Sequence, residues 1–480
     1  MYKTFLRFAL AVKPVLQRIS VRTSPDTDEK YFPCGNYFLS QGQKTVIHAP
    51  GFFGICKANS ILWRTNVRSF RASARDALNV TLYGRFFAFI MDTAFPVCGI
   101  VAEYNPFHSG HMFHIRRTRE SLGGDVVIVC VMSGNFVQRG DFAVLDKYAR
   151  AETAVRGGAD LVLELPLAAA LSSAEGFARG AVALLHGIGC RYLSFGAETA
   201  DISLVQQAAE ALNALPPAAG NRSGLSYAAY RQQELAALNP AAAALLASPN
   251  NTLGIEYCRA LRDFPMQPLA IARRGAGHDE AAPADGFASA SLLRGYLREG
   301  GEERCAPYLP ECSIEVWRRE KARGAAPVTL PESAMLTLLR AALFRGALAT
   351  GSADGFDERC AAAVYSAVSF SDAVEKAQTR RFPAARVRRT LLRAALGISP
   401  DASPLPSYAR VLAFSARGRT LLRRQDGLPL IVKPVTEKQL PDALQPSLRL
   451  DAFADDLFGL ARPAPLPGGE HYRKTPFYLT

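Results

Sequence analysis

Between residues 96 and 200, short apolar segments alternate with segments of helical periodicity, and this alternation limits the folds open to the chain. The apolar segment 125–131 has no polar residue at alternate positions after Asp125, which is typical of parallel strands covered by helices on both faces. We therefore predict a doubly wound α/β domain whose ligand crevice lies at the carboxyl ends of the strands. The predicted strands are 96–102, 125–132, 160–165 and 191–196, and the predicted helices are 111–122, 146–156 and 172–186.

Three of the seven histidines lie within seven residues, directly after the first predicted strand. His108 and His111 flank Gly110 in a turn that leads into a helix. Backbone N–H groups at a helix N-terminus attract phosphate, and imidazoles can hydrogen-bond the charge that builds on an α-phosphate during adenylyl transfer. A nucleoside triphosphate is therefore the ligand that this turn favours.

Two other interpretations of these histidines stay open. They can be structural residues whose hydrogen bonds are satisfied within the fold, or they can be ligands of a zinc ion. Zinc fits poorly, because no cysteine or carboxylate stands at a ligand spacing on the same helix. We predict no metal site built by the protein alone.

A second phosphate clamp is predicted about 180 residues downstream, in the segment 287–294. Ser289 and Ser291 stand at the start of a helix, and Arg294 follows one turn inside it. Hydroxyl groups, unpaired backbone N–H groups and a guanidinium in this arrangement suit a phosphate. The alternative is an ordinary serine-capped helix with a solvated arginine, which is the better explanation for this segment taken alone.

Other predicted strand ends also carry polar groups. The segment 133–141 is rich in glycine and polar residues, and it leads to Asp146, a candidate N-cap, and then to Lys147 and Arg150 on one helical face. Gly196 follows the fourth strand, where glycine would let the backbone approach a ligand. Ordinary turn chemistry and a solvated charged helix explain each feature separately, but their convergence on one sheet edge favours a ligand site.

The remainder of the α/β domain is predicted to be helical over 200–265, with a further strand at 268–272. We place the end of this domain near residue 300, so that it spans 91–300. Residues 301–480 are predicted to form a mostly helical, basic domain. Arg386, Arg388, Arg389 and Arg393 lie there close to aromatic residues, a combination that suits RNA, although a solvated amphipathic surface is equally compatible.

The first ninety residues differ from the rest in charge. They hold 13 Lys and Arg against 4 Asp and Glu, or +9 of the total of +13, which leaves only +4 for the other 390 residues. We predict that 1–90 is a non-native or disordered extension and that the protein starts at Met91. An arginine-rich targeting or RNA-binding arm is the alternative.

The nine cysteines are spread singly, without a C-x-x-C pair, which favours reduced thiols and a cytoplasmic location. We assign no cysteine to chemistry. No segment reaches the roughly 18 uninterrupted apolar residues of a membrane helix, so no membrane association is predicted.

Four motifs together resemble the tRNA(Met) cytidine acetate ligase family, from about residue 97 almost to the C-terminus. They are the segments 103–111 (EYNPFHSGH), 132–140 (MSGNFVQRG), 248–257 (SPNNTLGIEY) and 289–294 (SASLLR), and 408–414 (YARVLAF) also looks familial. The first ninety residues have no counterpart in the family. The loop 275–279 departs from the family pattern by being one residue short.

The resemblance implies a nucleotidyltransferase-like fold with an HxGH motif and a two-step reaction. ATP and free acetate would give acetyl-adenylate and pyrophosphate, and the wobble cytidine of elongator tRNA(Met) would then be acetylated at N4, with Mg²⁺ as a further cofactor. His108, His111 and Arg294 would be catalytic, with Ser289 and Ser291 beside the phosphates. The residues implied for ATP binding are Val101, Ala102, Glu103, Tyr104, Asn105, Pro106, Phe107, His108, Ser109, Gly110, His111, Met112, Phe113, His114, Gly196, Asn250 and Arg273, with Asn251 and Arg274 as adjacent alternatives.

Two competing functions remain. A small-molecule adenylyltransferase of the same superfamily would use the same nucleotide turn, but such enzymes are usually one compact domain without a long basic helical half. An RNA-binding protein with a non-catalytic nucleotide site is the other alternative. The intact His108, His111 and Arg294 argue against it.

Overall fold

The computed structural model describes residues 96–480 except 217–223, 274–285, 349–354, 424–426, 434 and 436, together with four strands nearer the N-terminus. The chain divides into two compact units, Met1–Ile90 and Met91–Thr480. The predictions on Met91 as the start, on Arg274 and on the loop 275–279 fall outside the described residues. Within the first unit, β1 (Ser20–Thr23), β2 (Thr45–Ala49), β3 (Phe52–Lys57) and β4 (Ser60–Leu62) form an antiparallel sheet in that order.

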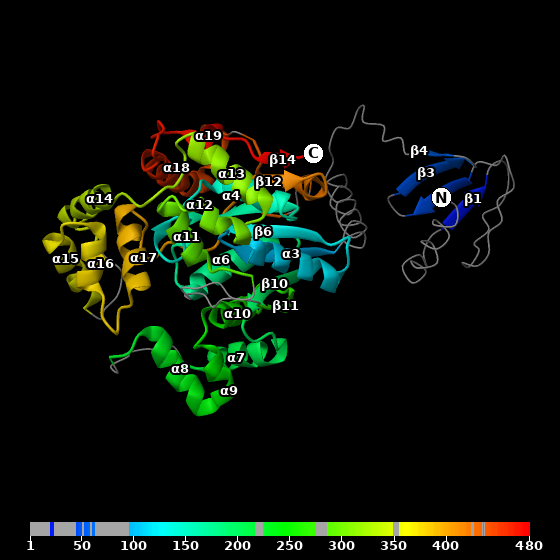
Figure 1. Ribbon diagram of the computed structural model, residues 1–480. Coiled ribbons are helices and arrows are strands. Elements are labelled where there is room, and N and C mark those ends of the chain that lie inside the picture. The colour runs from blue at the N-terminus through cyan, green and yellow to red at the C-terminus, as the bar shows by residue number, and fades with distance from the viewer. Residues whose placement is uncertain are drawn as a thin grey trace. The chain divides into compact units, whose positions relative to one another are not determined.

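The second unit is built on a mainly parallel sheet surrounded by helices (Figure 1). The strand order of this sheet reverses at its centre. Its parallel strands are β5 (Val97–Ala102), β6 (Val127–Ser133), β9 (Leu161–Leu165), β10 (Tyr192–Ala197) and β11 (Gln267–Ala272), in the spatial order β11-β10-β5-β6-β9. The chain first winds from β5 to β6 and β9, and then returns to place β10 on the other side of β5. In doubly wound sheets, ligands bind at such a switch point.

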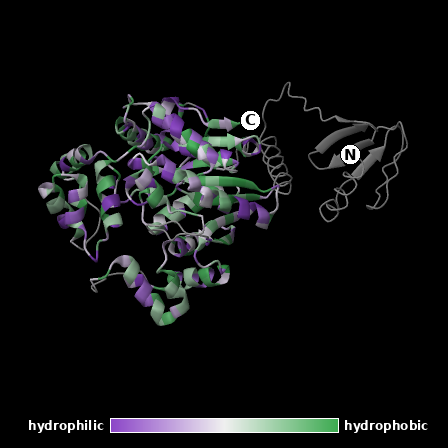
Figure 2. Cartoon of the chain, viewed as in Figure 1, coloured by the Kyte–Doolittle hydropathy of each residue, from purple (hydrophilic) through white to green (hydrophobic). Residues whose placement is uncertain are grey.

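The strands are apolar throughout because helices cover both faces. Val129 and Leu163 face one layer, which includes α6 (Ala174–Gly187) and α10 (Pro249–Ala260), whereas Ile128 faces α3 (Ser109–Leu122) and α4 (Lys147–Arg156) on the other. Alternate side chains of a strand point to opposite faces, so a strand covered on both sides shows no polar alternation. Figure 2 shows the central strands in the hydrophobic colour.

Smaller elements surround these layers. They are β7 (Phe136–Val137), β8 (Asp141–Phe142), α5 (Leu167–Ala170), α7 (Ile202–Ala214), α8 (Tyr227–Leu238), α9 (Pro240–Leu245), α11 (Ala290–Arg298), α12 (Glu302–Cys305), η1 (Ala306–Tyr308) and α13 (Glu311–Ala322). Strands and helices predicted between 96 and 200 agree with the observed bounds to within about two residues.

The C-terminal region is mostly helical, as predicted, and also contributes strands to the main sheet. A separate apolar core holds together α14 (Glu332–Phe344), α15 (Phe356–Ser366), α16 (Phe370–Ala377) and α17 (Ala384–Ala395). The chain then returns as β12 (Ala409–Ser415), which pairs antiparallel with β9. The remaining elements are η2 (Gly418–Arg423), β13 (Leu430–Ile431), η3 (Glu437–Gln439), η4 (Asp442–Leu444), α18 (Gln445–Leu460), α19 (Glu470–Arg473) and β14 (Phe477–Leu479), of which β13 and β14 pair with β12.

Candidate active site

The histidine turn lies at the carboxyl end of β5, at the switch point, and forms the N-terminus of α3. His108 is the N-cap: its Nδ1 accepts a hydrogen bond from the N–H of Gly110 at 3.1 Å, and its own N–H donates to Nδ1 of His111 at 3.2 Å. The two rings stack with centroids 3.7 Å apart. Because each Nδ1 accepts a hydrogen bond, the proton of each neutral ring lies on Nε2. Both imidazoles therefore carry an N–H donor on Nε2.

Tyr104 packs against this turn and has an unusual backbone conformation. Its φ of +48° lies in the left-handed region, which a bulky residue rarely adopts. Its buried ring meets His111 edge-on at 4.8 Å, and its hydroxyl lies 3.2 Å from Sγ of Cys130. Burial raises the pKa of the Cys130 thiol to about 12, so this sulfur stays protonated and serves packing. Such strain at a turn is common in functional sites.

The imidazoles of His111 and His114 are held in the neutral form. Burial is the main cause that lowers the pKa of His111 well below its usual value, and the nearby charge of Arg273 lowers it further. Burial and Arg273 lower the pKa of His114 to about 4, and His114 Nε2 lies 2.9 Å from Oγ of Ser194 on β10. Neutral rings donate hydrogen bonds without net charge. Positive charge for a bound phosphate must therefore come from arginines and from the N-terminus of α3.

The predicted second clamp meets the histidine turn. Ser289 caps α11, its Oγ accepting from the N–H of Leu292 at 3.2 Å and lying 3.2 Å from Oγ of Ser291. One turn on, Arg294 Nη1 donates to the carbonyl oxygen of Asn105 at 2.9 Å. Burial lowers the pKa of Arg294, and Glu103 opposes that shift. His108, His111 and Arg294, the three predicted catalytic residues, thus belong to one small region.

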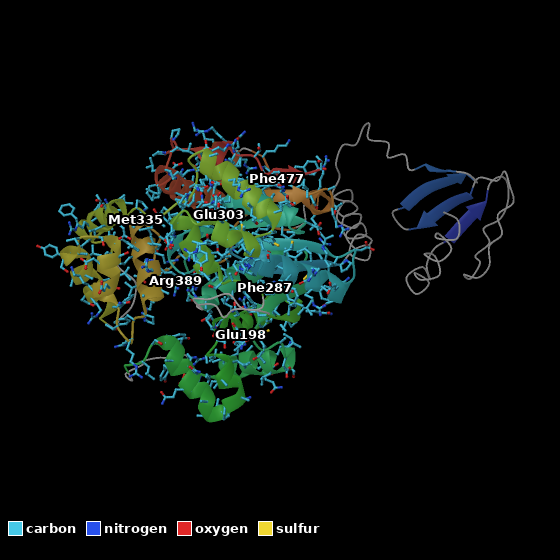
Figure 3. All side chains as sticks on the ribbon, in the orientation of Figure 1. Glu198, Phe287, Glu303, Met335, Arg389 and Phe477 are labelled. Atoms are coloured by element: carbon cyan, nitrogen blue, oxygen red, sulfur yellow. The ribbon has the colours of Figure 1, made fainter. Side chains whose placement is uncertain are left out.

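Aromatic contacts also join the two clamps. Phe287 lies just before α11 (Figure 3). Its ring meets that of Phe113 of α3 edge-on, with ring centroids 6.0 Å apart. A Cβ added to Gly110 would lie 3.8 Å from the Phe287 ring and only 2.9 Å from the His108 ring. Glycine is therefore required between the histidines, because any side chain there would displace the N-cap imidazole.

The other predicted nucleotide residues surround the end of β10. Gly196 lies opposite Ile271, and a Cβ on it would lie 3.4 Å from Cγ of Arg273. Asn250 Nδ2 donates to Oε1 of Glu198 at 2.5 Å, while the buried Asn251 donates from its backbone to the same carboxylate and accepts from the N–H of Thr199. Of the two asparagines left open by the sequence, Asn250 has the more accessible side chain.

Comparison with known proteins identifies the family. Residues 95–468 match the family model described as HIGH Nucleotidyl Transferase. The tRNA(Met) cytidine acetate ligase of Syntrophotalea carbinolica is 40% identical over 356 residues, which cover 69% of this chain and 84% of the relative. That of Acetivibrio thermocellus is 33% identical over 393 residues, which cover 75% and 94% respectively. The chain belongs to the tRNA(Met) cytidine acetate ligase family.

Solved structures of one relative agree with this assignment. Thermotoga maritima TmcAL bound with alpha-thio ATP matches with a TM-score of 0.72 and 30% identity, covering 80% of this chain and 99% of that chain. The apo form of the same protein gives a TM-score of 0.73. The predicted family, its fold class and its enzyme class, a ligase, are confirmed by these comparisons.

In this family member, Arg150 joins the two loops that border the site, a role not apparent in the sequence. Its fully buried guanidinium donates to the carbonyl oxygens of Glu103 at 2.6 Å and Ser133 at 3.2 Å, and also to those of Gly134 and Leu145. Burial lowers its pKa to about 10. A solvated charged helix was the alternative explanation of this face in the sequence, but in the structure Arg150 fastens the turns after β5 and β6 to each other.

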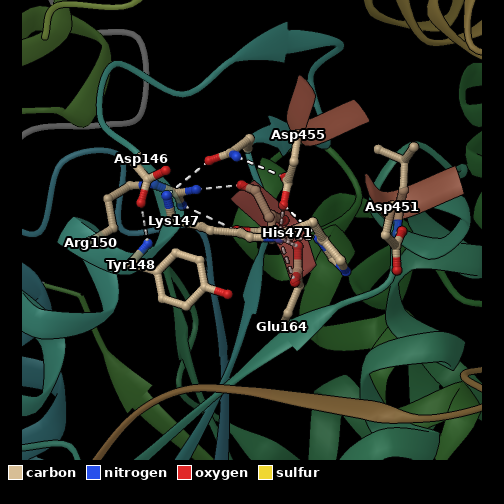
Figure 4. Close-up of polar contacts among 12 residues, drawn as sticks. Asp146, Lys147, Tyr148, Arg150, Glu164, Asp451, Asp455 and His471 are labelled. Atoms are coloured by element: carbon tan, nitrogen blue, oxygen red, sulfur yellow. Dashed lines mark hydrogen bonds and ion pairs between the residues drawn. The ribbon is translucent and has the colours of Figure 1, made fainter. Parts of the chain in front are cut away.

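Lys147, one turn earlier, is also fully buried and lies in a cluster of charges (Figure 4). Its Nζ lies 2.6 Å from Oε1 of Glu164 and 2.6 Å from Oδ2 of Asp455. His471 Nδ1 lies 2.6 Å from the same Asp455 oxygen, and burial together with Lys147 lowers the pKa of His471 to about 4. The cluster joins β9 and α4 to the C-terminal helices α18 and α19 beside the site.

The arginines predicted to bind tRNA have different surroundings. Arg389 Nη1 donates to the carbonyl oxygen of Gln138 at 3.1 Å, and Arg393 donates to those of Ala168 and Ser399. Arg386 lies over the rings of Phe356 and Phe382, 4.5 and 5.0 Å from their centroids. Arg388 is half-buried. Arg389 lies where α17 faces the sheet (Figure 3).

No helix in the described part of the chain is both long enough and apolar enough to cross a membrane.

Proposed function

We propose that this chain is an ATP-dependent acetate ligase that forms N4-acetylcytidine at the wobble position of elongator tRNA(Met) in the cytoplasm. The observation that carries the proposal is the meeting of His108, His111 and Arg294 around one turn at the switch point of the sheet. The names of the relatives and the ATP analogue bound to a relative of similar fold support it.

In the first step, an oxygen of acetate attacks the α-phosphorus of ATP. A new P–O bond forms, the bond from the α-phosphorus to the bridging oxygen breaks, and pyrophosphate leaves with that electron pair. Acetate is already anionic, so the site needs stabilisation of negative charge more than a base. The Nε2–H groups of His108 and His111, the N-terminus of α3 and the Arg294 guanidinium are the groups suited to this task.

In the second step, N4 of the cytidine attacks the acetyl carbonyl carbon, AMP leaves, and N4 loses one proton. AMP is a good leaving group, so no strong base is required, and we name none. Gly196, Asn250 and Arg273 are proposed to contact the nucleotide together with residues 101–114, and Ser289 and Ser291 to lie beside the phosphates.

Magnesium is implied by the family resemblance. Among the described residues, no group of three or more His, Cys, Asp or Glu side chains could hold a metal ion. These residues do not form a protein-built metal site, so we derive no step through magnesium. Mg²⁺ is often bound mainly by substrate phosphates, and we propose that it arrives with ATP.

The first experiment is exchange of labelled pyrophosphate into ATP with and without acetate. Exchange that depends on acetate supports the ligase. Exchange that depends on another acid or a phosphate ester would identify a small-molecule adenylyltransferase instead, and absence of exchange with every acid would favour an RNA-binding protein with a non-catalytic site. Loss of N4-acetylcytidine from the tRNA of a deletion strain tests the second substrate.

A further inference from the structure

Glu103 carries the one carboxylate of the nucleotide turn 101–114, and it directly follows β5. Its side chain is half-buried, whereas residues 104–107 after it are buried. Oε1 accepts a hydrogen bond from the N–H of Gln138 at 2.8 Å, and the carbonyl oxygen of Glu103 accepts one from Arg150 at 2.6 Å. The residue is therefore held at the switch point of the sheet through both its side chain and its backbone.

Two further elements lie close to this carboxylate. Burial lowers the pKa of Arg294 on α11, and the charge of Glu103 opposes that shift. Burial also raises the pKa of Tyr257 on α10, and the Glu103 charge raises it further. Because the interaction of two charges weakens with distance, both effects place the Glu103 carboxylate near these side chains. It thus lies beside the guanidinium that is proposed to hold the phosphates.

The carboxylate can accept further hydrogen bonds. An ionised carboxylate has about four lone-pair sites, and within the described part of the chain the Gln138 N–H is its only hydrogen-bond donor. No described lysine, arginine or histidine forms an ion pair with it. Arg294 and Arg150 donate to the backbone carbonyl oxygens of Asn105 and Glu103 instead. Oε2 is therefore the oxygen that a ligand can use.

The chemistry of the substrates decides which group this oxygen can receive. A carboxylate accepts hydrogen bonds and carries negative charge, so the anionic oxygens of a triphosphate or of acetate are excluded as partners. The target cytidine offers a donor, its N4 amino group, for which Asp and Glu are the usual side-chain acceptors. Uridine has a carbonyl oxygen at the same place, which a carboxylate repels. Position agrees with chemistry, because N4 must reach an acetyl group on the α-phosphate that Arg294 is proposed to hold.

We propose that Oε2 of Glu103 accepts a hydrogen bond from N4–H of the target cytidine, orients N4 towards the acetyl group and selects cytidine over uridine. This inference rests on the proposed function and deepens it by naming the residue that recognises the second substrate. The backbone of Glu103 remains part of the nucleotide turn, and its carboxylate faces the other substrate.

Glu103→Gln tests this contact with little change of shape. Glutamine keeps the side-chain length and the oxygen that accepts from Gln138, but an amide nitrogen, which donates and does not accept, replaces Oε2. The measurement is binding of fluorescent elongator tRNA(Met) anticodon stem-loops, with cytidine or uridine at the wobble position, to the full chain with ATP and without acetate. The wild-type protein is expected to prefer the cytidine stem-loop by about tenfold, and Glu103→Gln to lose or reverse this preference.

A second readout separates the two chemical steps. Acetate-dependent pyrophosphate exchange needs no RNA, whereas acetyl transfer to tRNA requires N4 to be in place. In Glu103→Gln, the loss in single-turnover acetyl transfer is expected to exceed the loss in exchange by about tenfold. Equal losses in the two reactions, or a raised Mg²⁺ requirement for exchange, would assign the carboxylate to the nucleotide and overturn the proposal.

Glu120→Gln is the matched control, because it removes the same charge from an exposed position near the other end of α3. It should keep the wild-type preference for cytidine, and an equal loss there would also count against Glu103. A wild-type protein that binds both stem-loops equally well would refute the inference without any variant. Absence of acetate-dependent exchange in the wild type would reject the proposed function, whereas normal exchange without a preference for cytidine would reject this contact alone.

Discussion

Arg294 donates a hydrogen bond to the carbonyl oxygen of Asn105 across 189 residues of sequence. This bond holds a guanidinium from α11 beside the turn that carries His108 and His111. It thereby joins the two predicted phosphate clamps, which neither segment could do alone. The proposed triphosphate site needs several donors that converge on one group of oxygens, and this bond brings the Arg294 guanidinium to the histidine turn.

Arg294→Lys should therefore reduce adenylation although it keeps the charge. A lysine ammonium is a point donor that cannot reproduce the planar fork needed to hold the Asn105 carbonyl and a phosphate together. We expect kcat/KM for ATP in acetate-dependent pyrophosphate exchange to fall about 10²- to 10³-fold. Arg298→Lys, one turn further along α11 and paired with Asp141, is the control and should stay near wild type. Equal effects of the two variants would contradict the assignment.

His108→Asn separates helix capping from chemistry. Asparagine is among the best N-cap residues, so it can accept the Gly110 N–H, but it lacks the Nε2–H of the imidazole. The free energy of unfolding should change by less than about 1 kcal/mol, while exchange should fall about 10²- to 10³-fold. Ser173→Ala, which removes the cap of α6, should show the reverse: a stability loss of about 1 kcal/mol and normal exchange. Near-normal exchange in His108→Asn would remove the histidine from the mechanism.

The sheet and the histidine turn could be predicted because their signals are local. The apolar strands, the glycine beside His108 and the serine cap before Arg294 each reflect the backbone conformation of a few neighbouring residues. The strand β12 was not predicted to join the sheet, because its partner β9 lies some 250 residues earlier and its register depends on tertiary packing. The left-handed Tyr104 carries no sequence signal, since bulky residues rarely adopt that conformation.

Charged residues were the hardest to interpret from sequence. Lys147, Arg150 and Arg389 stand on helices with charged neighbours, a pattern that usually indicates a solvated face. All three instead find partners far away in sequence: Asp455 for Lys147, the Glu103 and Ser133 carbonyls for Arg150, and the Gln138 carbonyl for Arg389. A single sequence does not reveal which distant acceptors a buried cation will meet.

The buried cluster makes Lys147 important for stability. Lys147→Met would leave the carboxylates of Glu164 and Asp455 buried without their cation, and breaking a buried pair in this way costs about 3–5 kcal/mol. Lys376→Met is the matched control, because its ion pair with Asp372 is partly exposed to solvent and such surface pairs contribute about 0–1 kcal/mol. Chemical denaturation of both variants measures the difference. A loss below about 1 kcal/mol in Lys147→Met would show that the carboxylates are protonated or hydrated in the folded protein.

His114 should make folding sensitive to mild acid. Its pKa falls from 6.5 to about 4 in the folded protein through burial and the Arg273 charge. Below pH 6.5 the unfolded chain therefore binds a proton that the folded chain does not, and stability falls as the pH drops until it levels off near pH 4. The shift corresponds to about 3 kcal/mol. His114→Gln removes this group, whereas the other histidines titrate in both proteins. The difference in unfolding free energy between wild type and variant should thus change by about 3 kcal/mol from pH 7 to pH 4, and parallel stability curves over that interval would show that His114 is not held neutral.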